Sequence, residues 1–136
     1  MMLAMQPTAG EAQEMENPPS FDGVISLLTF TGDWIGAGMF CCDEAFACKV
    51  GSAMLITSVE QVNADVLDGI GEMANIILGN IKEVLEAETG PLTLGIPTVV
   101  WGKNFCARTV VKTPWTIVPF ECAGGKFEVR GAVQPV

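Results

Sequence analysis

The sequence NADVLDGIGEMANIILGNIKEVLE, residues 63–86, decides the fold because it predicts one long amphipathic helix. Successive residues of an α-helix are turned by about 100°, so apolar residues at this spacing share one narrow stripe. The stripe contains Val66, Ile70, Met73, Ile77, Ile81 and Val84. A second apolar flank beside it contains Leu67, Ala74, Leu78 and Leu85. We expect both to face a hydrophobic core.

The opposite face of this helix carries polar and small residues and is expected to face solvent. It contains Asp68, Glu72, Asn75, Gly79 and Lys82. Glu72 and Asn75 are three residues apart and are therefore neighbours on the helix surface. A carboxylate can hold a cation or a lysine, and an amide can orient a water molecule because it both donates and accepts hydrogen bonds. An amphipathic helix also needs polar side chains on its exposed face, so spacing alone leaves both interpretations open.

Two glycines and a second asparagine on this helix call for separate explanations. Gly71 and Gly79 each cost a helix about 1 kcal/mol relative to alanine. The missing side chains would let another backbone or helix come close to the outer face. Asn80 points toward the border of the core stripe, so we expect it to hydrogen-bond a neighbouring loop and hold the helix in place.

The composition limits the possible chemistry. The chain has 136 residues, 49% of them hydrophobic, which fits one folded domain with a single core. Its formal charge of −9, from 16 acidic and 7 basic residues, argues against nucleic acid as a partner, because no basic surface could replace counterions. The chain contains no histidine, which excludes serine–histidine and cysteine–histidine catalysis. Any catalysis must use carboxylates, amides or the groups of a partner.

The cysteines and the apolar runs bear on metal binding and location. Five cysteines are present, irregularly spaced, at positions 41, 42, 48, 106 and 122. We expect buried thiols in a reducing compartment, and no metal site, because Cys-x-x-Cys pairs and histidines are missing. No apolar run reaches the roughly 18 residues of a membrane span, and the MMLAM start lacks the basic region of a signal peptide. The expected location is the cytoplasm, without membrane contact.

The residues before the long helix predict a β-hairpin and a shorter helix. Phe21–Phe30 and Trp34–Cys42 are apolar-rich runs joined by the turn sequence Thr31-Gly32-Asp33. Asp43–Leu55 has apolar residues at helical spacing, and Asp43 is placed to cap its first turn. Asn63 is placed in the same way to cap the long helix.

The residues after the long helix predict strands. Thr89-Gly90-Pro91 is a combination that ends helices. The runs that follow are Leu92–Trp101 around Pro97, Phe105–Lys112, Trp115–Glu121 and Lys126–Val133, the last two joined by Ala123-Gly124-Gly125. The chain is therefore predicted to be an α+β domain, in which a long central helix and a shorter helix lie on one face of a largely antiparallel sheet.

The domain is expected to span residues 21–136. Met1–Gln6 has the pattern of the last turn of a helix and is too short to be stable alone. Residues 7–20 contain glycine, glutamate, asparagine and paired prolines, which predict a flexible, loosely attached segment.

The outer face of the helix also carries a family motif. In the CheX and CheC chemotaxis phosphatases, a helix bears Glu-x-x-Asn followed shortly by Gly-Asn, and this chain resembles them in Glu72, Asn75, Gly79 and Asn80. The resemblance runs from about Phe21 to the end of the chain. It includes the Thr31-Gly32-Asp33 turn, Gly36–Phe40, Gly95–Val100 with Gly102, and Val118-Pro119-Phe120 before Gly124 and Gly125.

This resemblance implies a phosphatase that acts on the phospho-aspartate of a CheY-like receiver domain. Asn75 would place a water molecule in line with the phosphorus, and Glu72 would pair with a lysine of the receiver. Asp68, Gly79 and Lys82, on the same face, would contact this partner. The receiver would supply Mg²⁺, so the chain would need no cofactor of its own. Such a reaction depends mostly on positioning and electrostatics, which suits a chain without histidine.

Two features differ from the family pattern. Members usually have a fuller N-terminal helix than the one expected at Met1–Gln6. CheC-type members carry two copies of the motif, whereas the only other match here is Glu60-Gln61-Val62-Asn63, whose asparagine is better explained as a helix cap. A single motif favours the CheX type, whose members resemble one another in being homodimers.

Two other functions use the same helix face. A non-catalytic signalling module would bind a receiver or another partner through this face without hydrolysing anything. A structural dimer would bury the face against a second copy, and cross-linking through a cysteine placed at residue 72 would detect it. The presence of both Glu72 and Asn75 favours the enzyme.

Overall fold

The computed structural model describes residues 8–16, 19–55, 58–106, 112–122 and 125–136. Its elements are β1 (Thr8–Ala9), β2 (Gln13–Met15), β3 (Phe21–Gly32), β4 (Trp34–Cys42), α1 (Glu44–Leu55), α2 (Ala64–Thr89), β5 (Leu92–Leu94), β6 (Thr98–Phe105), β7 (Trp115–Cys122) and β8 (Gly125–Pro135). The predicted α+β class is confirmed. In the part of the chain described here, no helix is long and apolar enough to cross a membrane.

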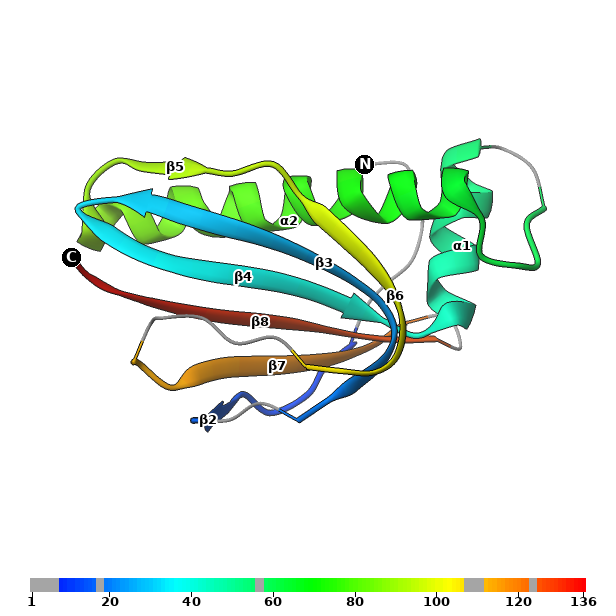
Figure 1. The fold of residues 1–136 in the computed structure, drawn as a ribbon, viewed down its shortest axis with the longest axis horizontal. Helices are drawn as coiled ribbons and strands as arrows, with labels where there is room; N and C mark the ends of the chain where they lie inside the picture. Colours follow the sequence, from blue (N-terminus) through cyan, green and yellow to red (C-terminus); the bar gives the residue numbers. More distant parts are fainter. Residues whose placement is uncertain (1–7, 17–18, 56–57, 107–111, 123–124) are drawn as a thin grey trace.

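The strands form one sheet in which every pairing between described strands is antiparallel. Their order is β1-β7-β8-β4-β3-β5, with β2 also paired to β7 and β6 paired to β3. Figure 1 shows α2 running along the sheet, and α1 at one end of the molecule, roughly across the direction of α2. Both helices contribute to the larger of two core clusters, whereas the smaller cluster contains strand residues only. The helices therefore cover one face, as predicted.

Local signals placed both helices correctly. The Asp43 side chain accepts a hydrogen bond from the Phe46 N–H at 2.8 Å and caps α1. Asn63 does the same for α2, accepting from the Val66 N–H at 2.9 Å. At the other end of α2, Gly90 has φ of 74°, a conformation that favours glycine, and its N–H bonds to the Glu86 carbonyl at 3.0 Å.

The buried side of α2 agrees with the predicted core stripe only in its first half. Val66, Ile70 and Met73 are buried, as predicted. The prediction that Val84, in the same stripe, faces the core is wrong, because its side chain is 76% exposed. In the second half the sheet-facing residues are those of the other flank: Leu78 is buried, and Leu85 packs against the core. The side of the helix that faces the core is therefore centred closer to the flank with Leu78 and Leu85 than to the stripe with Val84.

The connection after α2 differs from its prediction in a way that matters for the outer face. The expected single strand Leu92–Trp101 is two strands, β5 and β6, both paired with β3. They are separated at residues 95–97, where Pro97 has no N–H to donate to a ladder. The predicted strand Phe105–Lys112 lies largely outside the described residues, and only its first residue belongs to β6.

The N-terminal segment also differs from its prediction. Thr8 pairs with Glu121, and Met15 pairs with Trp115, so this part of the segment expected to be loosely attached extends the sheet beside β7. Backbone hydrogen bonds to β7, which a composition rich in turn residues does not reveal, account for the difference. The predicted helix end at Met1–Gln6 lies outside the described residues.

The cysteines are not uniformly buried. Cys41, Cys42 and Cys122 are buried as predicted, but Cys48 is partly exposed and Cys106 is exposed. Burial raises the pKa of Cys41 to about 12, so this thiol stays protonated and unreactive at neutral pH. The prediction of buried thiols is wrong for Cys106, which follows the last residue of the edge strand β6.

Candidate functional site

The outer face of α2 borders an open hollow of about 530 Å³. Three of the predicted site residues line it, namely Asp68, Glu72 and Asn75, and all three are exposed. The other wall is the connection between β5 and β6, from Leu94 to Val99. The carboxylate and the amide that the motif placed on one helix face thus lie at the same hollow, with a second segment of the chain opposite them.

Two glycines let the connection lie close to its neighbours, Gly71 to the helix and Gly95 to β3. A Cβ added at Gly71 would lie 3.2 Å from Val99 Cγ2 and 3.9 Å from Pro97 Cγ. On the connection itself, the Gly95 N–H donates to the Thr29 carbonyl of β3 at 2.8 Å. A Cβ on Gly95 would lie only 2.6 Å from the Thr29 hydroxyl oxygen. Gly71 therefore faces the chain's own connection, which explains its absent side chain without a partner.

The remaining residues predicted on this face lie further along α2. Lys82 forms an ion pair with Glu86 at 3.1 Å. Glu86 also accepts the Leu92 N–H at 2.9 Å, which ties the end of the helix to β5. The Leu92 N–H and the Lys82 ammonium together hold the pKa of the Glu86 carboxyl below its usual value. Lys82 therefore helps to attach β5 and does not line the hollow.

Gly79 and Asn80 also lie outside the hollow. A Cβ added at Gly79 would lie 3.9 Å from Leu94 Cδ2, an ordinary contact, so β5 runs close to this position. Asn80 is exposed, and its side chain makes no hydrogen bond to another described residue. The anchoring role predicted for Asn80 therefore gains no support from the described part of the chain.

The chemistry available at the hollow is that of oxygen and amide groups. Glu72 offers a carboxylate, and Asn75 offers one donor and one acceptor group on a rigid helix. Across the described ranges, no group of three or more histidine, cysteine, aspartate or glutamate side chains is arranged to hold a metal ion. An exposed carboxylate and amide can position water and a cationic side chain, but the reacting group must come from another molecule.

Comparison with known families places this arrangement in context. The chain matches the family model of the chemotaxis phosphatase CheX over residues 24–121, which include all of α2 and the β5–β6 connection. The chain belongs to the CheX family. The Glu-x-x-Asn helix of this CheX-family chain therefore lies within the matched region.

Solved structures agree with the family assignment. CheX from Desulfovibrio desulfuricans is 25% identical with a TM-score of 0.86, over 98% of this chain and 89% of that chain. Two further structures, at lower identity, show the same fold. A CheC-like superfamily protein from Shewanella sp. PV-4 is 22% identical with a TM-score of 0.86, over 98% and 87% of the two chains. The CheX–CheY–BeF3–Mg²⁺ complex from Borrelia burgdorferi contains a chain that is 23% identical with a TM-score of 0.82, over 98% and 88%. A comparison with curated proteins finds no significant match.

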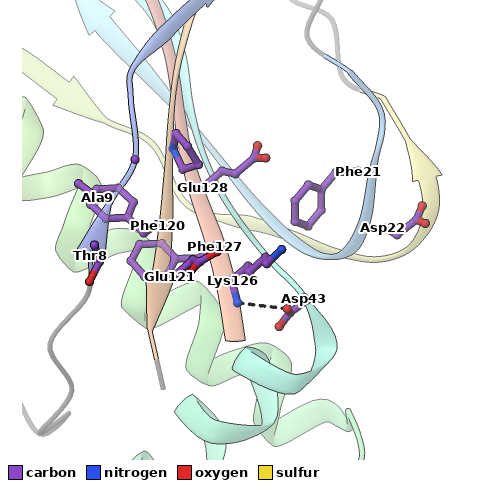
Figure 2. Close-up of a pocket in the computed structure, with 12 residues that line it drawn as sticks. Thr8, Ala9, Phe21, Asp22, Asp43, Phe120, Glu121, Lys126, Phe127 and Glu128 are labelled. Carbon is purple, nitrogen blue, oxygen red and sulfur yellow. Dashed lines mark hydrogen bonds between the residues drawn. The ribbon is translucent and has the colours of Figure 1, made fainter. Parts of the chain in front are cut away.

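A larger hollow of about 610 Å³ lies at another part of the CheX-family chain, between β1, β7, β8 and the start of β3. Figure 2 shows several acidic side chains around it, together with Lys126 and three phenylalanines. Its Asp43 carboxylate is already used, because it caps α1 and accepts the Lys126 backbone N–H at 3.1 Å (Figure 2). The hollow beside α2 is smaller, but its polar side chains are not committed to the fold.

Sequence reasoning did not foresee the second wall of the site. Gly95, Ile96 and Pro97 carry part of the family resemblance, but the resemblance assigns them no role. The Gly-x-Pro sequence signals a break in a strand, but only the pairing of β5 and β6 with β3 brings that break alongside α2 (Figure 1). There it lines the same hollow as Asn75.

Proposed function

We propose that this protein is a phosphatase that hydrolyses the phospho-aspartate of a CheY-like receiver domain. The observation that carries the proposal is the exposed pair Glu72 and Asn75, side by side at an open hollow on α2, in a chain of the CheX family. A related structure is a complex with CheY, BeF3 and Mg²⁺, which supports a receiver as the partner.

In this mechanism the chain supplies positioning. Asn75 holds a water molecule in line with the phosphorus, with its amide oxygen accepting a hydrogen bond from that water. Glu72 pairs with the lysine of the receiver and so fixes the two domains relative to each other. Mg²⁺ sits in the receiver and neutralises charge on the phosphoryl group. Phosphoryl transfer needs little covalent help from a protein, so two well-placed side chains suffice.

The contact surface proposed here is narrower than the whole outer face of α2. Asp68 borders the same hollow and is proposed to contact the receiver. Gly79 lies close to Leu94 of β5, since a Cβ added there would be 3.9 Å from Leu94 Cδ2, and Lys82 already pairs with Glu86. Their contribution to binding is therefore proposed to be indirect, through the position of β5.

The chain is further proposed to act as a cytoplasmic homodimer. Among the described strands, β6 at one edge of the sheet pairs only with β3, so its other edge has free backbone groups. Light scattering of the purified protein gives its mass in solution directly. A mass of one chain would contradict the dimer without affecting the proposed reaction.

The proposed reaction is tested by mixing the protein with a panel of receivers that have been phosphorylated by acetyl phosphate with Mg²⁺. Phosphate release is then followed over time. We expect the lifetime of the phosphate on a cognate receiver to shorten at least tenfold. The double variant Glu72→Gln/Asn75→Ala should abolish the acceleration.

The alternative is a binding module that uses the same face. It predicts that the protein binds a receiver activated by beryllium fluoride but never shortens the lifetime of its phosphate. The binding module would be the correct function if the double variant still binds the receiver and the unsubstituted protein does not accelerate dephosphorylation.

A further inference from the structure

One apolar side chain near the site is far more exposed than a folded protein requires. Within the described ranges, the large apolar residues that remain exposed are Ile76, Val84, Ile96, Trp101 and Val136. Ile96 has the greatest exposed fraction of these, at 90%. Single exposed apolar residues are common on protein surfaces, so the position of Ile96 has to decide whether it has a role.

Ile96 lies at the functional hollow. It forms part of the wall that faces Glu72 and Asn75 across the open space. Two other exposed apolar residues, Trp101 and Val84, are placed differently. The Trp101 ring N–H donates to Glu44 at 2.7 Å, which gives that side chain a role in the fold. Val84 is nine residues beyond Asn75 and therefore about half a turn away around the helix, on the side opposite the hollow.

The backbone that carries Ile96 is held on both sides. The preceding residue, Gly95, is bonded to the Thr29 carbonyl at 2.8 Å. The following residue, Pro97, has a fixed φ and lies against the helix at Gly71. The connection is three residues long and joins two strands that both pair with β3 (Figure 1). A side chain presented from so short and well-anchored a connection loses little conformational entropy when a partner covers it.

The charge around the hollow indicates the kind of partner. Among the described residues that line it, the ionisable ones are Asp68 and Glu72, both acidic, and none is basic. Such a surface complements a partner that presents a basic side chain next to an apolar patch. A receiver with a lysine beside its phosphorylated aspartate supplies the basic side chain. The apolar patch would be the part of the receiver surface that Ile96 covers.

We infer that Ile96 is an apolar anchor that docks the receiver domain, with its side chain buried against the receiver while Glu72 and Asn75 reach the phosphoryl group. This inference rests on the proposed function and adds a binding residue to it. Ile96 is a docking residue and not a catalytic one, so its loss should raise KM and leave kcat unchanged. Apolar anchors at the centre of an interface carry a large share of the binding energy.

The test uses steady-state dephosphorylation of a receiver that the unsubstituted protein accelerates. Ile96→Ala should raise KM about tenfold with kcat within about twofold. Ile96→Leu keeps the apolar volume and should restore KM to within about twofold. Val84→Ala shortens another exposed apolar side chain, on the opposite side of α2, and should change neither constant. The two Ile96 variants should keep the melting temperature because the position is exposed, and Val84→Ala should keep or slightly raise it because alanine is the better helix former.

Each other result overturns the anchor. An unchanged KM in Ile96→Ala, with activity still lost in Asn75→Ala, would contradict the docking role of Ile96 and would not affect the proposed function. A lower kcat at unchanged KM would assign Ile96 to the chemical step. A change of mass in solution without a change in KM would assign it to contacts between copies. Failure of the unsubstituted protein to accelerate any receiver would overturn the proposed function, and the anchor with it.

Discussion

The outer face of α2 is used differently in its two halves. In the first half, Asp68, Glu72 and Asn75 are exposed at the hollow, and no hydrogen bond or ion pair joins their side chains to a described residue. In the second half, Lys82 pairs with Glu86, and Glu86 accepts the Leu92 N–H. Both halves look alike in the sequence, as polar residues at helical spacing.

The difference shows that polar residues on one helix face can serve two purposes. Those of the second half attach the helix to β5 and so hold one end of the connection that forms the wall of the hollow. Those of the first half contribute nothing visible to the fold, so substituting them should change activity and leave stability intact. The following substitutions test this division.

Asn75→Ala is expected to have the largest effect. In the proposed mechanism, loss of the amide would leave the attacking water without a fixed position, and misplaced reacting groups cost about 100-fold in rate. The acceleration of receiver dephosphorylation should therefore fall by about 100-fold, measured by phosphate release. The melting temperature should stay the same or rise slightly, because alanine is the better helix former.

Asn80→Ala is the matched control, since Asn80 is an exposed asparagine on the same helix. It should keep full activity. A marked loss of stability in Asn80→Ala would support the anchoring role predicted from the sequence, whereas full activity in Asn75→Ala would remove the proposed mechanism.

Glu72→Gln should have the next largest effect. The substitution keeps the shape of the side chain and removes the charge that is proposed to pair with the receiver lysine. We expect KM to rise about tenfold, with a smaller change in kcat, measured at low salt where charge pairs act most strongly. Glu83→Gln changes an exposed glutamate of the second half and is the control. Equal effects of the two variants would mean that only net charge matters.

Gly71→Ala and Gly79→Ala compare the packing of the two halves. Alanine gains about 1 kcal/mol over glycine in a helix interior. Gly79 has room for the added Cβ, so Gly79→Ala should raise the free energy of unfolding by most of that amount. At Gly71 the Cβ would lie 3.2 Å from Val99 Cγ2, so the gain should be offset by crowding. Urea unfolding measures both, and equal stabilisation would show that the connection is not closely packed on the helix.

Glu86→Gln should have the smallest effect, on stability only. The folded pKa of Glu86 is lowered, so its ionised form contributes stability above the unfolded value of 4.5 and loses it as the pH falls through the folded pKa. We therefore expect the melting temperature of Glu86→Gln to be slightly below that of the unsubstituted protein at neutral pH. The difference should shrink below pH 4.5. A difference that persisted in acid would rule out the carboxylate charge as its source.

The local signals in the sequence predicted most of the elements. The caps at Asp43 and Asn63 and the end of α2 at Gly90 are interactions between residues three or four positions apart. The hairpin pairs β3 with β4, the next strand in the chain, across the short turn that the sequence indicated. The sequence also predicted that Glu72 and Asn75 are exposed neighbours, because helical geometry alone requires it.

Long-range contacts account for the predictions that differ from the structure. Residues 8–15 join the sheet because β7, about 100 residues later in the chain, offers a free edge. Val84 is exposed because the sheet lies closer to Leu78 and Leu85 than to the stripe drawn from helical spacing. Lys82 pairs within its own helix, next to a strand whose position the helix sequence does not contain.

The sequence by itself determined that one helix carries a buried face and an exposed Glu-x-x-Asn face, since periodicity and capping are properties of neighbouring residues. Only the tertiary structure decided which part of that outer face is free. The pairing of β5 and β6 with β3 brings residues 94–99 alongside α2, where they form the second wall of the hollow beside Asn75. The other end of β5 is bonded to α2 through the Leu92 N–H and Glu86. The physical reason is that a sheet joins residues far apart in the chain, and their register is set by backbone hydrogen bonds that no helix pattern encodes.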